Sequence, residues 1–171
     1  MEAMQNLLER RSVHKYQEKQ VTDELLDQVL TAGLYAPTGM NRQNVVMVAV
    51  RDSQTRDQLM RMNAAVMGAQ NDPFYGAPCV IVVLGDPENY PVVENGSLVL
   101  GNLMNAAHAV GLGSCWIHRA KQMFETEEGK ALLRQWGLKD TLVGIGNCIL
   151  GYPAENPEAR PRLDGRIVKI G

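Results

Sequence analysis

The segment 97–110 limits the possible folds of this chain more than any other part of the sequence. Its apolar side chains cover nearly the whole circumference of a helix: Leu98, Val99, Leu100, Leu103, Met104, Ala106, Ala107, Ala109 and Val110. The strongly polar residues, Asn102, Asn105 and His108, recur at every third position on one narrow stripe. A helix of this kind has no water-facing side and must be buried in most directions. We therefore expect it at the centre of a homodimer interface, with the polar stripe satisfied across that interface. A central helix in a monomeric core is the alternative.

Shorter patterns predict the remaining elements of one domain. Capping residues and apolar periodicity predict four more helices, at about 4–10, 23–34, 53–62 and 126–136. Continuous apolar runs predict three buried strands, at 45–50, 79–84 and 143–150. Extended pieces are expected at 114–117 and 167–170, and a flexible connection at 71–78. The alternation of helices and strands indicates an α+β or α/β sandwich.

The composition argues against several classes of protein. The formal net charge is -2, so there is no basic surplus for binding nucleic acid. No apolar run reaches the ~18 residues that span a bilayer, and the first nine residues carry two glutamates and lack the apolar core of a signal peptide. The cysteines, at 79, 115 and 148, are far apart and odd in number. We therefore expect buried free thiols, a cytoplasmic location, and no metal site and no membrane contact.

Basic side chains gather at the two ends of the chain. The first cluster is Arg10-Arg11-Ser12-Val13-His14-Lys15-Tyr16, and the last is Arg160-Pro161-Arg162. A guanidinium group matches the acceptor oxygens of a phosphate, and a serine hydroxyl adds a donor. If the fold joins the two ends, they would form a phosphate site without a glycine-rich loop. Taken singly, each cluster is more typical of a solvated surface patch.

The sequence carries none of the common catalytic motifs: GxSxG, HExxH, a P-loop or GxGxxG. Their absence fits chemistry that is carried by a cofactor. Three further segments, read in order with the two basic clusters, resemble the motifs of the nitroreductase family of flavin enzymes. They are Ala36-Pro37-Thr38-Gly39-Met40-Asn41-Arg42-Gln43, Gly111-Leu112-Gly113-Ser114-Cys115-Trp116-Ile117 and Gly151-Tyr152-Pro153. The order and spacing match over nearly the whole chain.

The resemblance implies a three-layer α/β/α sandwich of the α+β class, with a mostly antiparallel central sheet, assembled as a homodimer with FMN at the interface. It implies a single domain over 1–171, whose C-terminal arm, about 155–171, reaches the partner subunit. By similarity, the FMN phosphate and ribityl chain would be held by Arg10, Arg11, Ser12, His14, Arg160 and Arg162. The flavin would be lined from the other subunit by Pro37, Thr38, Gly39, Asn41 and Gln43. Backbone groups near the reactive flavin nitrogen would come from Ser114, Cys115 and Trp116.

The implied activity is the ping-pong transfer of reducing equivalents from NADH or NADPH to an electron-poor acceptor, such as a nitroaromatic or a quinone. Other enzymes of the same superfamily, and a protein that stores or senses FMN without turnover, are the alternatives. The chain departs from the family pattern at His14, where an arginine or lysine is usual. Because an anion favours the protonated imidazole, we expect FMN affinity to weaken above neutral pH. Cys115 has no accompanying base motif, so we do not expect it to act as a nucleophile.

Overall fold

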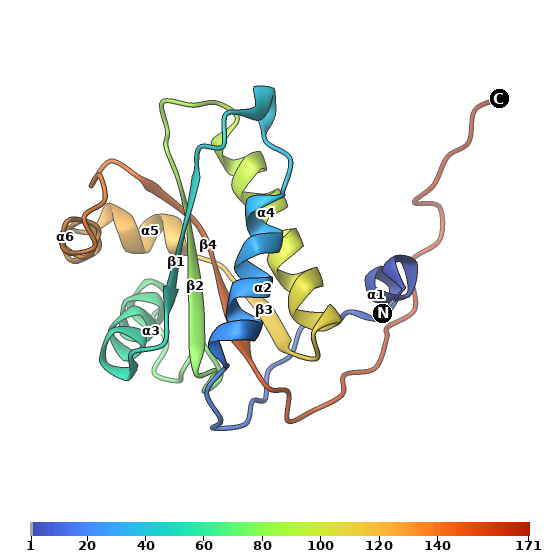
Figure 1. Cartoon of the computed structure of the whole chain (residues 1–171), viewed down its shortest axis with the longest axis horizontal. Coiled ribbons are helices and arrows are strands. Elements are labelled where there is room, and N and C mark those ends of the chain that lie inside the picture. The colour runs from blue at the N-terminus through green and yellow to red at the C-terminus, as the bar shows by residue number, and fades with distance from the viewer. Residues whose placement is uncertain (1) are drawn as a thin grey trace.

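The computed structural model describes residues 2–171, in which a four-stranded sheet lies between two layers of helices (Figure 1). The strands are β1 (Val45–Val50), β2 (Cys79–Gly85), β3 (Gly113–Ile117) and β4 (Val143–Gly151). They lie in the order β1-β2-β4-β3, and every neighbouring pair is antiparallel. One face carries α2 (Asp23–Leu34) and α4 (Val92–Ala109); the other carries α3 (Ser53–Met67), α5 (Ala120–Glu125) and α6 (Glu127–Gln135). Outside these layers are α1 (Ala3–Glu9) and the 3-10 turn η1 (Gly39–Asn41). The predicted three-layer α+β sandwich is confirmed.

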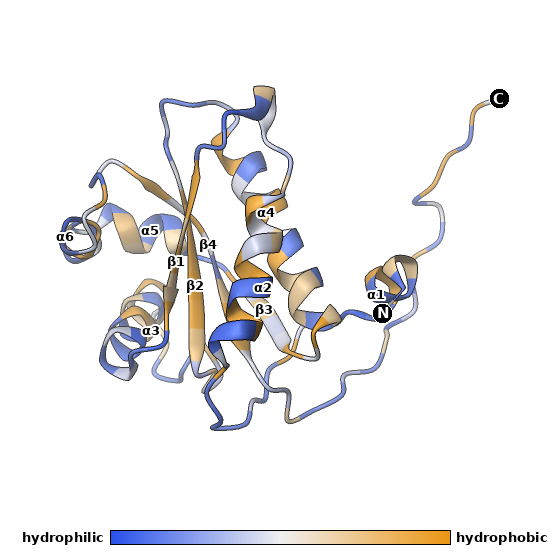
Figure 2. Ribbon diagram, viewed as in Figure 1, coloured by the Kyte–Doolittle hydropathy of each residue, from blue (hydrophilic) through white to orange (hydrophobic). Residues whose placement is uncertain are grey.

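The alternation of side chains along β2 builds both halves of the core. Val80, Val82 and Leu84 belong to the cluster beneath α3, α5 and α6, and the residues between them belong to the cluster beneath α2 and α4. The whole of β2 is buried because strands flank it on both sides and helices cover both faces. Figure 2 shows these apolar strands between helices whose outer faces are polar.

The predicted helix starts follow from side-chain caps. The side chains of Thr22, Asp52 and Thr126 each accept a hydrogen bond from the backbone N–H three residues further on. Such a cap satisfies one of the N–H groups that the first turn leaves without a partner. The helices begin where the sequence predicts because these local bonds decide their first residues.

Strand β1 is half-buried, so the prediction of a fully buried strand at 45–50 was wrong. Of its six residues, only Val50 is buried. The strand lies at the edge of the sheet and pairs only with β2. An apolar run alone does not distinguish an edge strand from a central one.

Helix α4 begins at Val92, five residues before the predicted start at 97. Asn95 and Gly96 resemble helix breakers, but both are buried and both have a packing role. A Cβ atom added at Gly96 would lie 2.6 Å from Cγ1 of Ile145, so only glycine lets the helix approach β4 this closely. Asn102 donates to the Ala32 carbonyl of α2, so this part of the polar stripe is satisfied within the chain and not across an interface.

Three other expectations also differ from the structure. Helix α5 was not predicted, because it is only six residues long and its N-cap residue has no side-chain hydrogen bond. The segment 71–78, expected to be flexible, is a hydrogen-bonded turn around Asp72. Within the described chain, residues 167–170 form no strand; the C-terminal segment passes α1 and extends away from the sandwich (Figure 1).

Candidate functional site

The backbone brings the two ends of the chain together. Residues 12–17 run beside β3 and the end of β4: the Val13 N–H donates to the Ser114 carbonyl at 3.1 Å, and the Ala154 N–H donates to the Lys15 carbonyl at 2.8 Å. These bonds hold the first basic cluster where β4 ends and the C-terminal segment begins. The two basic ends of the chain therefore lie close together, as a shared phosphate site would require.

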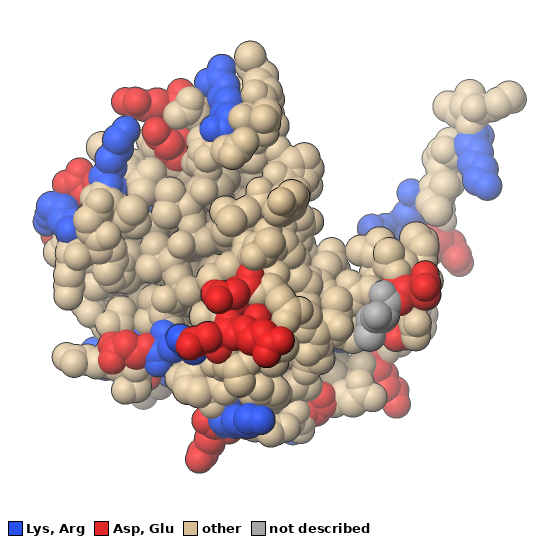
Figure 3. Space-filling view, viewed as in Figure 1, with Lys and Arg blue, Asp and Glu red and all other residues tan. Residues whose placement is uncertain are grey.

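A cleft of about 760 Å³ lies between the two basic clusters, and we call it the basic cleft. Its lining consists of Arg10, Arg11, Ser12, His14 and the tail residues 157–162, which include Arg160 and Arg162. Figure 3 shows Lys and Arg side chains on the C-terminal segment together with acidic atoms on the same segment, and a separate acidic group near the lower end of α2.

Two guanidinium nitrogens at the basic cleft, Nη1 of Arg10 and Nε of Arg11, are buried and have no hydrogen-bond partner. A buried N–H group without an acceptor is unfavourable by about 1–3 kcal/mol, and more for a charged group. The donor set therefore fits an anion with several acceptor oxygens.

His14, which lines the basic cleft, contacts Cys115 of β3. The Nε2 atom of His14 lies 3.6 Å from Sγ of Cys115. Burial raises the pKa of the Cys115 thiol, although a hydrogen bond with Ser12 and the charge of Arg10 act in the opposite direction. The thiol stays protonated near neutral pH, and a protonated thiol is a poor nucleophile. That Cys115 does not act as a nucleophile stays a prediction.

The segment 37–44, which we call the polar loop, is held by one buried side chain of α4. Asn95 is 2% exposed. Its Oδ1 accepts from the Gly39 N–H at 2.9 Å, and its Nδ2 donates to Oδ1 of Asn44 at 2.8 Å. Three non-glycine residues of the loop have positive φ angles: Met40, Asn41 and Gln43. Such backbone angles persist only where the surroundings impose them, and Asn95 is part of those surroundings.

A second cleft, of about 520 Å³, lies between the polar loop, the end of α2 and β1. The predicted residues Pro37, Thr38, Asn41 and Gln43 line it. Apolar side chains such as Met47 and Val99 also line this cleft. A flat, semi-polar ring would find both amide groups and an apolar surface here.

The basic cleft and the polar loop lie at opposite ends of α4. Asn95, near the start of α4, holds the loop, whereas the Asn105 carbonyl, near its end, accepts from Asn6 of α1. Ten residues of helix correspond to roughly 15 Å. Within one chain, the structure does not bring the two predicted groups of site residues into contact.

The third predicted motif lines neither cleft. Ser114 and Cys115 are buried in β3, and Trp116 is half-buried, with its Nε1 atom buried and unpartnered. Among residues 2–171, no three His, Cys, Asp or Glu side chains gather as metal ligands, and no helix is long and apolar enough to cross a membrane.

Sequence reasoning missed two residues near these clefts. Asn95 supports the polar loop, and Tyr75 packs on His14 with ring centroids 4.7 Å apart. The Asn95-Gly96 pair interrupts an apolar run of the sequence, and this interruption is a signal that could have pointed to Asn95. Nothing in the sequence around Tyr75 indicates its contact with a residue 61 positions earlier.

Comparisons with known proteins agree with this architecture. The model of the nitroreductase family matches residues 7–152. A protein of Archaeoglobus fulgidus, provisionally named an NADH dehydrogenase/NAD(P)H nitroreductase, is 31% identical over 163 residues, covering 92% of this chain and 88% of that protein. The NADPH-flavin oxidoreductase of Vibrio harveyi is 25% identical, covering 96% and 71%.

Among solved structures, a nitroreductase with bound FMN from Bacteroides fragilis superposes with a TM-score of 0.89 at 25% identity and full coverage of both chains. The family match spans most of the chain, and the fold, the motif order and a relative above 30% identity agree with it. This chain belongs to the nitroreductase family.

Proposed function

We propose that this protein is an FMN-dependent oxidoreductase that transfers reducing equivalents from NADH or NADPH to an electron-poor acceptor, such as a nitroaromatic or a quinone. Its family, a relative named an NADPH-flavin oxidoreductase and a structural neighbour with bound FMN support this proposal. The observation that carries it is the basic cleft, where Nη1 of Arg10 and Nε of Arg11 are buried without acceptors, whereas Nη1 of Arg11 donates to the Leu8 and Arg10 carbonyls.

The residues of the basic cleft fit the phosphate of FMN. A phosphate monoester carries about -1.5 to -2 charges at pH 7 and three acceptor oxygens. Arg10 and Arg11 would donate from one side and the tail arginines, Arg160 and Arg162, from the other. Ser12 would add a hydroxyl donor, and His14 would add an imidazole.

The second half of the site would come from another copy of the chain. The polar loop lies roughly 15 Å along α4 from the elements that carry the basic cleft, so we infer a homodimer in which the loop of one subunit meets the cleft of its partner. Large apolar side chains are exposed on α1, on α4 and on the C-terminal segment: Met4, Leu7, Leu8, Val93, Leu98, Leu163, Ile167, Val168 and Ile170. Exposed apolar surface of this extent is typical of an interface, and the segment 155–171 would be the arm that covers the partner.

Bound FMN supplies the hydride and electron transfer, so the chain itself needs no nucleophile. The arginines would hold and neutralise the phosphate, and the polar loop would present Asn41 and Gln43 to the ring edge. Extended backbone of β3 at Ser114, Cys115 and Trp116 would lie on the reactive side. Protons would come from solvent. Donor and acceptor would use one pocket in turn, which implies ping-pong kinetics.

An anaerobic reduction experiment tests the proposed function. The protein is loaded with FMN, the oxidised flavin absorbance is recorded, and NADH or NADPH is added without oxygen. The expected result is bleaching, followed by recovery of the yellow colour when a quinone or nitroaromatic is added. A yellow protein that does not bleach with either nucleotide would instead be an FMN-storing or FMN-sensing protein. A protein that cannot be loaded with FMN would contradict both functions.

A further inference from the structure

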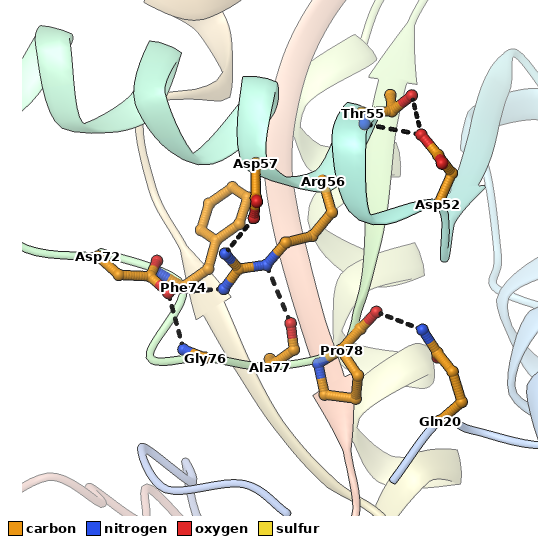
Figure 4. Close-up of polar contacts among 10 residues, drawn as sticks. All are labelled: Gln20, Asp52, Thr55, Arg56, Asp57, Asp72, Phe74, Gly76, Ala77 and Pro78. Atoms are coloured by element: carbon orange, nitrogen blue, oxygen red, sulfur yellow. Dashed lines mark hydrogen bonds and ion pairs between the residues drawn. The ribbon is translucent and has the colours of Figure 1, made fainter. Parts of the chain in front are cut away.

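A buried ion pair fixes the turn between α3 and β2. Arg56 of α3 has a side chain only 11% exposed, and its Nη2 lies 2.6 Å from Oδ2 of Asp72 (Figure 4). Its Nε donates to the Ala77 carbonyl at 3.1 Å. Asp72 also accepts from the N–H groups of Phe74 at 2.6 Å and Gly76 at 2.8 Å. One carboxylate and one guanidinium therefore set the backbone path of residues 72–77.

This turn presents Tyr75 in an unfavourable backbone conformation. Tyr75 has a φ angle of 54°, in the left-handed region that favours glycine. Its neighbour Phe74 is fully buried, whereas Tyr75 is 44% exposed. The tyrosine ring meets the ring of His14 edge-on, with centroids 4.7 Å apart and planes at 70°. Strained residues of this kind persist where the structure uses them.

We propose that Tyr75 is a positioning residue that holds the imidazole of His14 in the basic cleft, and that the Arg56–Asp72 pair holds Tyr75 in place. Tyr75 itself is not among the residues that line the cleft, so it would act through His14. The imidazole contacts both the Tyr75 ring and Sγ of Cys115, and these two contacts would limit its rotation. This inference rests on the proposed function, because the anion in the cleft is taken to be the FMN phosphate.

The charged groups around His14 favour its use as a phosphate ligand. Cys115 faces it from β3, Tyr75 from the turn before β2, and Glu155 from the C-terminal segment, where that carboxylate accepts the His14 backbone N–H. The other titratable or charged side chains that lie beside it or line the same cleft are Arg10, Arg11, Lys15, Tyr16, Glu158, Arg160 and Arg162. A phosphate would sit among the arginines of the cleft, which outnumber the carboxylates of Glu155 and Glu158.

The test measures FMN affinity by flavin fluorescence at pH 6 and pH 8 for wild type, Tyr75→Gly and Tyr75→Phe. Glycine accepts the φ of 54° without strain, so Tyr75→Gly removes the ring without destabilising the turn. We expect Tyr75→Gly to bind FMN roughly three- to tenfold more weakly than wild type, because an imidazole that has lost its aromatic contact is held less firmly against the phosphate. Tyr75→Phe keeps the ring and should behave as wild type. Comparing variants at one pH removes the titration of the FMN phosphate itself.

A second background separates positioning from general damage. In His14→Lys the imidazole that Tyr75 would hold is gone, so adding Tyr75→Gly should change FMN affinity by less than about twofold. Met67→Ala changes an exposed residue at the end of α3 and is the matched control. It should leave FMN affinity unchanged at both pH 6 and pH 8. Equal affinities of wild type and Tyr75→Gly at pH 6 would overturn the positioning role while leaving the proposed function intact. A wild-type protein that binds no FMN at either pH would overturn both.

Discussion

Asn95 offers the sharpest test of how the fold shapes the site. Its side chain is 2% exposed and makes one hydrogen bond to the Gly39 N–H and one to the Asn44 side chain. Each bond contributes a net 0.5–1.5 kcal/mol, so Asn95→Ala should lower the free energy of unfolding by about 2 kcal/mol. The polar loop would also lose the anchor that keeps its left-handed residues in place, so FMN affinity should fall together with stability.

Asn102→Ala is the matched control, because it lies on the same helix and makes a single hydrogen bond, to the Ala32 carbonyl. It should lower the free energy of unfolding by about 1 kcal/mol and leave FMN affinity unchanged. Both variants are measured by urea unfolding at one fixed protein concentration, followed by tryptophan fluorescence, and by FMN titration. If Asn95→Ala were no less stable than Asn102→Ala and bound FMN as wild type does, Asn95 would not be the anchor of the loop.

Three further predictions concern the cleft, the core and the thiols. Arg10→Ala should weaken FMN binding by about 10- to 100-fold, because it removes one charge-assisted hydrogen bond to the phosphate. Riboflavin, which has no phosphate, should bind Arg10→Ala about as well as wild type. Equal losses of affinity for both flavins would contradict a phosphate contact. Gly96→Ala should lower the free energy of unfolding by about 1–3 kcal/mol, because its Cβ atom would lie within 2.6–2.9 Å of Ile145 atoms; a urea midpoint equal to that of wild type would show that the α4–β4 contact relaxes freely. Burial raises the pKa of Cys79 to about 12 and raises that of Cys148 as well, whereas an unfolded cysteine loses its proton near pH 8.5. Above that pH the unfolded state binds fewer protons than the native state, so the free energy of unfolding should fall as pH rises from about 8.5 to 12. The fall should be less steep in Cys79→Ala. Parallel plots of unfolding free energy against pH for the two proteins would argue against this linkage.

The features that the sequence predicted correctly are local. The caps at Thr22, Asp52 and Thr126 and the apolar run of β2 act within a few residues, so the chain alone reveals them. The features that it did not reveal depend on partners distant in sequence. The edge position of β1 depends on which strands pair, and the early start of α4 depends on the fit of Gly96 against Ile145.

The candidate site shows the same division between local features, which the sequence predicts, and contacts distant in sequence, which it does not. Motif order predicted the residues of the basic cleft and of the polar loop, and the structure places the two ends of the chain beside each other. The Tyr75–His14 contact and the Asn95 anchor join residues tens of positions apart. No local pattern encodes such contacts; they follow from the turn at 72–77 and from the packing of α4.

Riboflavin lacks only the phosphate of FMN, so the ratio of the two affinities tests most directly whether the two basic ends of the chain form a phosphate site. Several charge-assisted hydrogen bonds from Arg10, Arg11 and the tail arginines should favour FMN by at least about 100-fold at low salt, and the ratio should fall in Arg10→Ala. Equal dissociation constants of the wild-type protein for FMN and riboflavin would contradict the account.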